Sequence, residues 1–139
     1  MQIRELTAED RDDVVDLWHE AGLTRPWNDP AGDFDRALIG ATSAAIGAFD
    51  AVELIATVMV GHDGHRGWVY YLAVMSTRRR AGLGRRLMSE AESWLLARGA
   101  VKVNVMIRHD NVDVLGFYDR LGYSDDEVTV RARWLREPT

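Results

Sequence analysis

The sequence predicts an α/β fold in which a mixed central sheet carries helices on both of its faces. Trp68–Val74 is a continuous aromatic and β-branched run, which is typical of a strand buried on both faces. A turn with two glycines follows, and the residues after it are apolar at helical spacing. Reading the whole chain in this way gives the order β-α-α-β-β-β-α-β-α-β. The apolar helix face after the turn consists of Leu87, Ala91, Trp94 and Leu95.

The first part of the chain predicts an edge strand and two helices. Gln2–Leu6 alternates briefly between polar and apolar residues. Thr7 and Asp10 have the spacing of an N-cap pair, so a helix should begin there and end at Gly22. Asp33 can cap a second, shorter helix. The apolar faces comprise Val14, Leu17, Trp18 and Ala21 in the first helix, and Phe34, Ala37 and Leu38 in the second.

A meander of strands is predicted next. Ala44–Phe49 and Glu53–Val60 are separated by a short polar link and resemble an antiparallel hairpin. The Asp63-Gly64 pair suits a tight reversal into the Trp68–Val74 strand.

The last part of the chain predicts a strand, a helix and a final strand. Val101–Ile107 reads as a strand. Asp110 or Asn111 should cap a helix that ends at Gly122. In Val128–Trp134 apolar and polar residues alternate, which predicts a half-exposed strand whose free edge would permit a homodimer.

Length and composition indicate a single domain, residues 1–139. The chain has 47% hydrophobic and 28% charged residues, as soluble globular proteins do. Its longest apolar runs are too short to cross a bilayer and no signal-peptide pattern is present, so we expect a cytoplasmic protein without a membrane partner. The absence of cysteine excludes disulfides, thiolate zinc sites and a cysteine-bound acyl intermediate.

Charge is unevenly distributed along the chain. A net charge of −5 argues against nucleic acid as a partner and favours a cationic small molecule or peptide. Five arginines nevertheless crowd around the glycine turn, which indicates an anionic ligand with several charges. They are Arg78, Arg79, Arg80, Arg85 and Arg86.

The turn itself reads Arg79-x-x-Gly82-x-Gly84 between a strand and a helix. The first N–H groups of such a helix have no intrahelical partner and, with the helix dipole, favour a phosphate. Neither the P-loop nor the dinucleotide-binding glycine pattern is present, so both of those classes are disfavoured. An ordinary connection between strand and helix is the alternative.

Two motifs in this order resemble the GNAT family of acetyl-CoA-dependent N-acetyltransferases. One is Arg79-x-x-Gly82-x-Gly84, and the other is Asn111-x-x-x-x-x-Phe117-Tyr118-x-Arg120-Leu121-Gly122-Tyr123. The resemblance covers nearly the whole chain and implies a single GNAT-like domain. Segments 23–30 and 61–67 resemble the YpeA-like branch of that family.

The resemblance implies a role for particular residues. The turn would hold the CoA pyrophosphate, and the preceding strand would pair with the pantetheine arm. The Val74 amide would polarise the thioester carbonyl, and Tyr118 would protonate the leaving thiolate, unless Tyr118 only packs. Asn111 is either a cofactor contact or a plain helix cap. The implied cofactor residues are Leu72, Ala73, Val74, Arg79, Arg80, Ala81, Gly82, Leu83, Gly84, Arg85, Asn111 and Tyr118.

Two positions depart from the family pattern. Ser76 stands near where a proline is usual, and Arg80 stands where a glycine is usual. Without that glycine the turn reaches positive φ less freely, so we expect a reshaped loop. The added positive charge of Arg80 would compensate for weaker CoA binding by contacting a phosphate.

The acceptor side is less defined. The proline-braced loop presents Arg25, Trp27 and Asn28, which we assign to an acceptor pocket together with Tyr70 of the strand; Trp27 could instead cap the core. An attacking amine also needs a base, and we expect no metal. A GNAT-like module that binds CoA or a protein without transferring acetyl groups is the alternative function. The candidate bases are His65, Asp63, His62 and Glu53.

Overall fold

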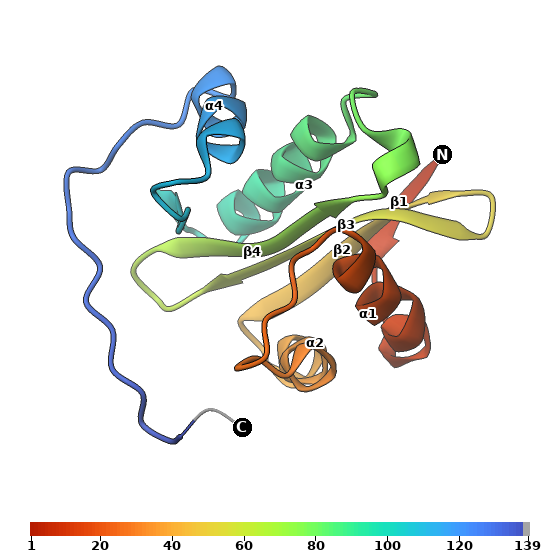
Figure 1. The fold of residues 1–139 in the computed structure, drawn as a ribbon, viewed down its shortest axis with the longest axis horizontal. Coiled ribbons are helices and arrows are strands. Elements are labelled where there is room, and N and C mark those ends of the chain that lie inside the picture. The colour runs from red at the N-terminus through yellow and green to blue at the C-terminus, as the bar shows by residue number, and fades with distance from the viewer. Residues whose placement is uncertain (138–139) are drawn as a thin grey trace. The chain divides into compact units, whose positions relative to one another are not determined.

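The structure is a computed structural model that describes residues 1–137 (Figure 1). The chain forms two compact units, one of residues 1–105 and one that begins at Met106. Among the helices of the described part, none combines the length and the apolar character needed to cross a membrane. The elements of the first unit are β1 (Gln2–Glu5), α1 (Arg11–Glu20), α2 (Pro30–Ile39), β2 (Ser43–Asp50), β3 (Glu53–His62), β4 (Gly67–Val74), α3 (Leu83–Ala97) and β5 (Val103–Val105), with short 3-10 helices at Ala8–Asp10 and Ser76–Arg78.

The five strands lie in one sheet in chain order. Neighbours from β1 to β4 are antiparallel, and β5 runs parallel to β4, so the predicted meander and the mixed sheet are confirmed. The predicted strand Val101–Ile107 is shortened to Val103–Val105, because its ladder with β4 extends only over Gly67–Val69.

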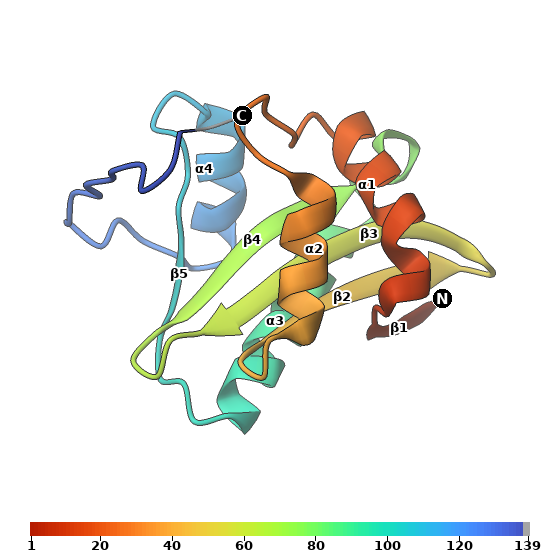
Figure 2. The ribbon, with the colours of Figure 1, turned by 90° about the horizontal axis from the view of Figure 1, so that it is seen from below.

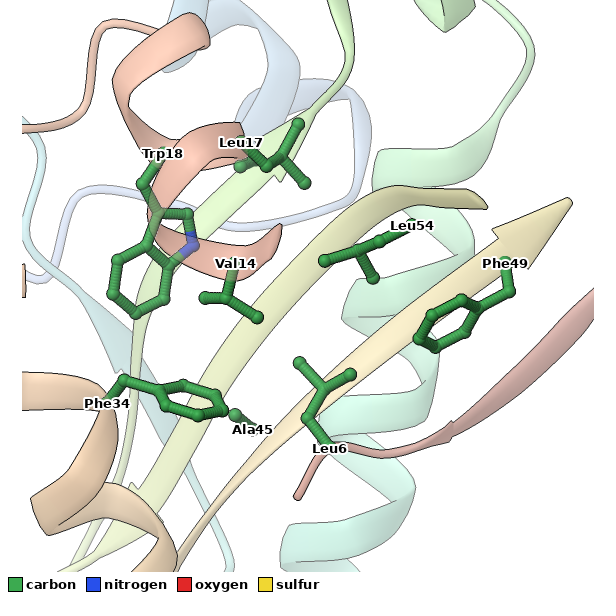
Figure 3. Close-up of a cluster of buried hydrophobic side chains, with 9 residues drawn as sticks. Leu6, Val14, Leu17, Trp18, Phe34, Ala45, Phe49 and Leu54 are labelled. Carbon is green, nitrogen blue, oxygen red and sulfur yellow. The ribbon is translucent and has the colours of Figure 1, made fainter. Parts of the chain in front are cut away.

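Helices cover both faces of this sheet, as predicted. In Figures 1 and 2, α1 and α2 lie over one face and α3 over the other. Figure 3 shows Trp18 and Val14 of α1 together with Phe34 of α2 above the strands, and none of the three has exposed surface. The buried cluster on this side consists of Leu6, Val14, Leu17, Trp18, Phe34, Ala45, Phe49, Leu54 and Ala73.

The second helix starts earlier than predicted. The N-cap of α2 is Asp29, whose carboxylate accepts the N–H of Gly32 at 3.1 Å, and Pro30 occupies the first helical position. Proline is favoured there because its fixed φ suits a helix and its missing N–H would be unpaired anyway. The prediction that Asp33 caps this helix is therefore wrong, and its side chain contacts Tyr71 instead.

Burial of β4 is less complete than its composition predicts. Val69 and Ala73 are buried, whereas Tyr70 is 43% exposed. The prediction of a strand buried on both faces is wrong, because most residues of β4 are half-buried or exposed.

The second unit contains α4 (Val112–Arg120), with Asn111 as its N-cap as predicted. The predicted final strand Val128–Trp134 is wrong, since residues 121–137 form no strand. A strand requires a hydrogen-bonded neighbour, and an alternating pattern needs a surface to cover its apolar side. Val128, Val130 and Trp134 are instead at least 60% exposed.

Candidate functional site

The edge of β4 that faces away from β3 is only partly paired. β5 pairs with Gly67–Val69, and within residues 1–137 no strand continues that pairing along Tyr70–Val74. On the other edge, the N–H of Met75 donates to the Ile55 carbonyl of β3 at 2.8 Å. In an extended chain, the backbone N–H and C=O groups of successive residues point to opposite edges of the strand. Because Met75 faces β3, the amide of Val74 points to the open edge. An extended ligand could add there as a strand does.

A β-bulge lies within this open stretch of β4. Thr57 pairs with Ala73 and Met59 pairs with Tyr70, so the single β3 residue between them faces two residues of β4. The first of these, Tyr71, has a φ of 52°. A bulge bends the strand and increases its twist, and one residue, Tyr70, separates this one from the last β4 residue that pairs with β5.

The turn after β4 places backbone amides before a helix. Arg80 and Gly82 have φ values of 68° and 78°, and α3 begins at Leu83. The N–H of Arg86 donates to the Gly82 carbonyl at 3.1 Å, so the amides of Leu83 and Gly84 precede the first helical hydrogen bond. A Cβ built on Gly82 meets no atom within 4 Å, which leaves space beside the turn for an anion. Arg80 adopts the positive φ that the missing glycine would have allowed.

The arginines around the turn are not equivalent. Arg78 lies 2.8 Å from the carboxylate of Asp50 and 3.4 Å from that of Glu53, so its charge already has partners on the β2–β3 hairpin. Arg79, Arg80, Arg85 and Arg86 belong to the turn and to the first turn of α3. Because of their position beside the amides of the turn, these four are the candidates for phosphate binding.

Glu20, which sequence reasoning missed, supports the start of the turn. Its carboxylate accepts the N–H of Ser76 at 3.2 Å. Hydrogen bonding by the Ser76 side chain, and less strongly the charge of Arg79, lower the pKa of Glu20. Since 56 residues separate the two partners, no local pattern could have revealed the contact.

The predicted acceptor residues lie in two places. Arg25 donates to the carbonyls of Gly22 and Thr24 at 2.9 and 3.0 Å, so part of its guanidinium is used to hold its own loop. Trp27 is 42% exposed, which argues against a role as a cap of the core. Asn28 is exposed on the same loop, and Tyr70 is exposed on β4.

The structure weakens two of the predicted bases. Asp63 accepts the backbone N–H groups of His65 and Arg66, both at 2.8 Å. The Arg66 contact, followed by that of His65, lowers the pKa of Asp63 to about 2, so its carboxylate is a poor proton acceptor. Glu53 is paired with Arg78. Within residues 1–137 no cluster of three His, Asp or Glu side chains could hold a metal ion.

The second unit holds the two residues of the downstream motif. The side chain of Asn111 accepts the N–H of Val114 at 3.3 Å, so the capping role is established. Tyr118 is buried and meets Phe117 and Tyr123 edge to face at 5.0 and 5.3 Å. Burial raises the pKa of Tyr118 to about 12, so its phenol stays protonated at neutral pH and can act as a proton donor.

The family model of the "Acetyltransferase (GNAT) family" matches residues 3–123, which include the bulged strand, the turn and α4. The chain belongs to the GNAT family. Its α/β fold is the GNAT fold, and solved structures of low sequence identity show the same arrangement.

One similar structure is apo aminoglycoside antibiotic 6'-N-acetyltransferase AAC(6')-IG from Acinetobacter haemolyticus, with 17% identity, a TM-score of 0.82 and coverage of 99% of this chain and 100% of that one. A second is AAC(6')-Iy in complex with the bisubstrate analogue CoA-S-monomethyl-acetylneamine, with 14% identity, a TM-score of 0.82 and coverage of 96% and 97%. A third is ribosomal-protein-alanine N-acetyltransferase from Brucella melitensis biovar Abortus 2308, with 17% identity, a TM-score of 0.76 and coverage of 96% and 100%.

Proposed function

We propose that this GNAT protein transfers an acetyl group from acetyl-CoA to a primary amine of a small molecule or peptide. The observation that carries the proposal is the continuous path from the open edge of β4 to the turn, where Arg80 and Gly82 have positive φ and the amides of α3 begin. An extended arm ending in a pyrophosphate requires such a pair of sites, one for a strand-like chain and one for an anion. The bisubstrate complex of AAC(6')-Iy supports acetyl-CoA as the donor.

The donor residues have distinct roles in this proposal. Backbone groups of Leu72 and Val74 hold the arm, whereas alternation turns the backbone of Ala73 toward β3. The amides of Arg79, Arg80, Ala81, Gly82, Leu83, Gly84 and Arg85 and the nearby guanidiniums hold the phosphates. Asn111 keeps its place as a proposed cofactor contact in addition to its cap.

The chemistry is direct transfer. The amine nitrogen forms a bond to the acetyl carbon while the carbon–sulfur bond breaks, and the Val74 amide donates to the carbonyl oxygen where negative charge develops. Tyr118, whose phenol is protonated at neutral pH, donates its proton to the departing thiolate. The proton released by the amine passes to solvent or to a base among His62 and His65, since Asp63 and Glu53 are engaged.

The acceptor is proposed to be cationic. The chain carries a net charge of −5, and similar structures are enzymes named for aminoglycosides and for a ribosomal-protein alanine. Arg25, Trp27, Asn28 and Tyr70 are proposed as its contacts, and the guanidinium of Arg25 would suit a carboxylate on the acceptor. Within the family we place the chain in the YpeA-like branch, on segments 23–30 and 61–67, and expect it in the cytoplasm. The homodimer predicted through a Val128–Trp134 strand loses its basis, because residues 121–137 form no strand.

Two measurements test the proposal. Saturating acetyl-CoA should raise the melting temperature, because a ligand that binds only the folded state stabilises it. A screen of aminoglycosides, polyamines and peptide N-termini, read by release of free thiol, should then give turnover with at least one acceptor. Binding without release in the whole screen would favour a silent CoA-binding module, and no thermal shift would exclude both functions.

A further inference from the structure

Tyr71 holds an unfavourable backbone conformation in the middle of β4. Its φ of 52° is in the left-handed region, which bulky residues other than glycine rarely occupy. The conformation belongs to the bulge, in which Tyr71 and Leu72 stand opposite the single residue Val58. A strained residue persists only when its surroundings hold it in place.

Three contacts, from α1, α2 and β3, hold Tyr71. Its ring stacks on the indole of Trp18, with ring centroids 3.8 Å apart and an angle of 7° between the planes. Its hydroxyl donates to the Asp33 carboxylate at 2.8 Å. Its carbonyl oxygen accepts the hydroxyl of Thr57 at 3.2 Å. We call these four residues the Tyr71 clamp.

Further contacts hold three of the members of the clamp. Trp18 and Thr57 have no exposed surface, and the indole N–H of Trp18 donates to the Thr57 hydroxyl at 2.9 Å. Arg36 donates to Asp33 at 2.7 Å, which orients the carboxylate from the other side. Burial, and then the bond to Asp33, raise the pKa of Tyr71, so its hydroxyl remains a donor across the working pH range.

We propose that Tyr71 is a positioning residue that fixes the open edge of β4 for the acyl donor. Leu72 follows Tyr71 directly and Val74 is the third residue after Tyr71, so the backbone torsion at Tyr71 sets the direction of both. The proposal rests on the proposed function, because it assigns that edge to acetyl-CoA. It gives Tyr71 no contact with the reacting atoms.

Four variants separate this role from general support of the core. Tyr71→Phe keeps the stacked ring and removes the bond to Asp33, and Asp33→Ala removes the same bond from α2. Asp33→Asn retains an oxygen acceptor and should behave close to wild type. Phe49→Leu, on β2 in the same buried cluster, is the control for lost core packing.

Two readouts are measured well below the melting temperature of every variant. Tyr71→Phe and Asp33→Ala should each raise the acetyl-CoA Kd about tenfold. The double variant should bind acetyl-CoA no more weakly than either single variant, because both substitutions remove the same hydrogen bond. Amide hydrogen exchange at Ala73 and Met75, whose backbones face β3, should become faster in the same variants and stay unchanged in Phe49→Leu.

The outcomes distinguish the clamp from the proposed function. The clamp would be overturned if Tyr71→Phe and Asp33→Ala both had the same amide exchange and the same acetyl-CoA affinity as the control Phe49→Leu. Fully additive losses in the double variant would also overturn it, since the two side chains would then act separately. A third outcome is that exchange becomes faster in the two variants although the wild-type protein does not bind acetyl-CoA. That result would support the clamp as the support of the bulge and would overturn only the proposed function.

Discussion

Arg78 reaches back from the start of the turn to Asp50, with 2.8 Å between its guanidinium and the carboxylate. Glu53 lies 3.4 Å from the same guanidinium, so the two acidic residues of the β2–β3 hairpin balance its charge. Among residues 1–137 neither Arg79 nor Arg80 forms an ion pair. Three consecutive arginines thus divide into one that fixes the turn and two that can meet a ligand.

Replacing these arginines in turn should separate the two roles. Arg79→Ala and Arg80→Ala should each raise the acetyl-CoA Kd about fivefold, because a cation near a phosphate contributes roughly 1 kcal/mol at an exposed site. Arg78→Ala should change the Kd about twofold or less. Isothermal titration at two salt concentrations provides the measurement, and a larger effect for Arg78 than for Arg80 would contradict the assignment.

The conformation of Arg80 predicts an effect on stability. At its φ of 68° a glycine has no steric penalty, whereas an alanine does. Arg80→Gly should therefore be more stable than Arg80→Ala by about 1 kcal/mol, although both remove the charge. Urea unfolding of the two variants measures the difference. Equal midpoints would mean that the turn relaxes when the arginine is replaced.

Tyr118→Phe should reduce kcat about a hundredfold and leave the acetyl-CoA Kd nearly unchanged, because the phenol is needed only when the thiolate departs. With its pKa at about 12, Tyr118 should not itself cause a loss of wild-type activity between pH 7 and pH 10. Steady-state kinetics over that range provide the measurement. A wild-type rate for the variant would remove the assignment as acid.

The buried phenol also predicts the alkaline stability. The pKa of Tyr118 is about 12 in the folded protein against 10.0 for a free side chain. Between these values the folded state binds more protons than the unfolded state, so the free energy of unfolding falls as pH rises from 10 to 12, by on the order of 2 kcal/mol. Below pH 10 the full stability is present. Denaturant unfolding of wild type and Tyr118→Phe should show a shallower decline in the variant.

The contacts of Asp10 predict how the stability of the folded protein changes at acidic pH. Arg4 binds its two carboxylate oxygens at 2.9 and 3.0 Å, and the N–H of Thr7 binds at 2.8 Å. The bond to Arg4 is the main cause that lowers the pKa of Asp10 from 3.8. The stabilisation is present above that value and is lost as pH falls through the lower folded pKa. Asp10→Asn should therefore be less stable than wild type at pH 7, and the difference should shrink below about pH 4.

Regular elements with a strong local signal were predictable. The helix α3 lies where its apolar spacing placed it, and the meander follows from its turn residues. The cap of α2 was misassigned to Asp33 because Asp29 and Asp33 are both aspartates, a residue type favoured at the N-cap. Only Pro30 as the first helical residue distinguishes them. The final strand was predicted from alternation alone, and alternation does not supply the neighbour that a strand needs.

The sequence alone determined the family motifs, the glycine turn after a strand and the order of the first nine elements, because these depend on residues close in the chain. Only the tertiary structure decided how the site is held. The Tyr71 bulge, the bond from Ser76 to Glu20 and the pairing of Arg78 join residues that are 14 to 56 positions apart. Such contacts form when packed elements bring distant side chains together, and no local pattern encodes them.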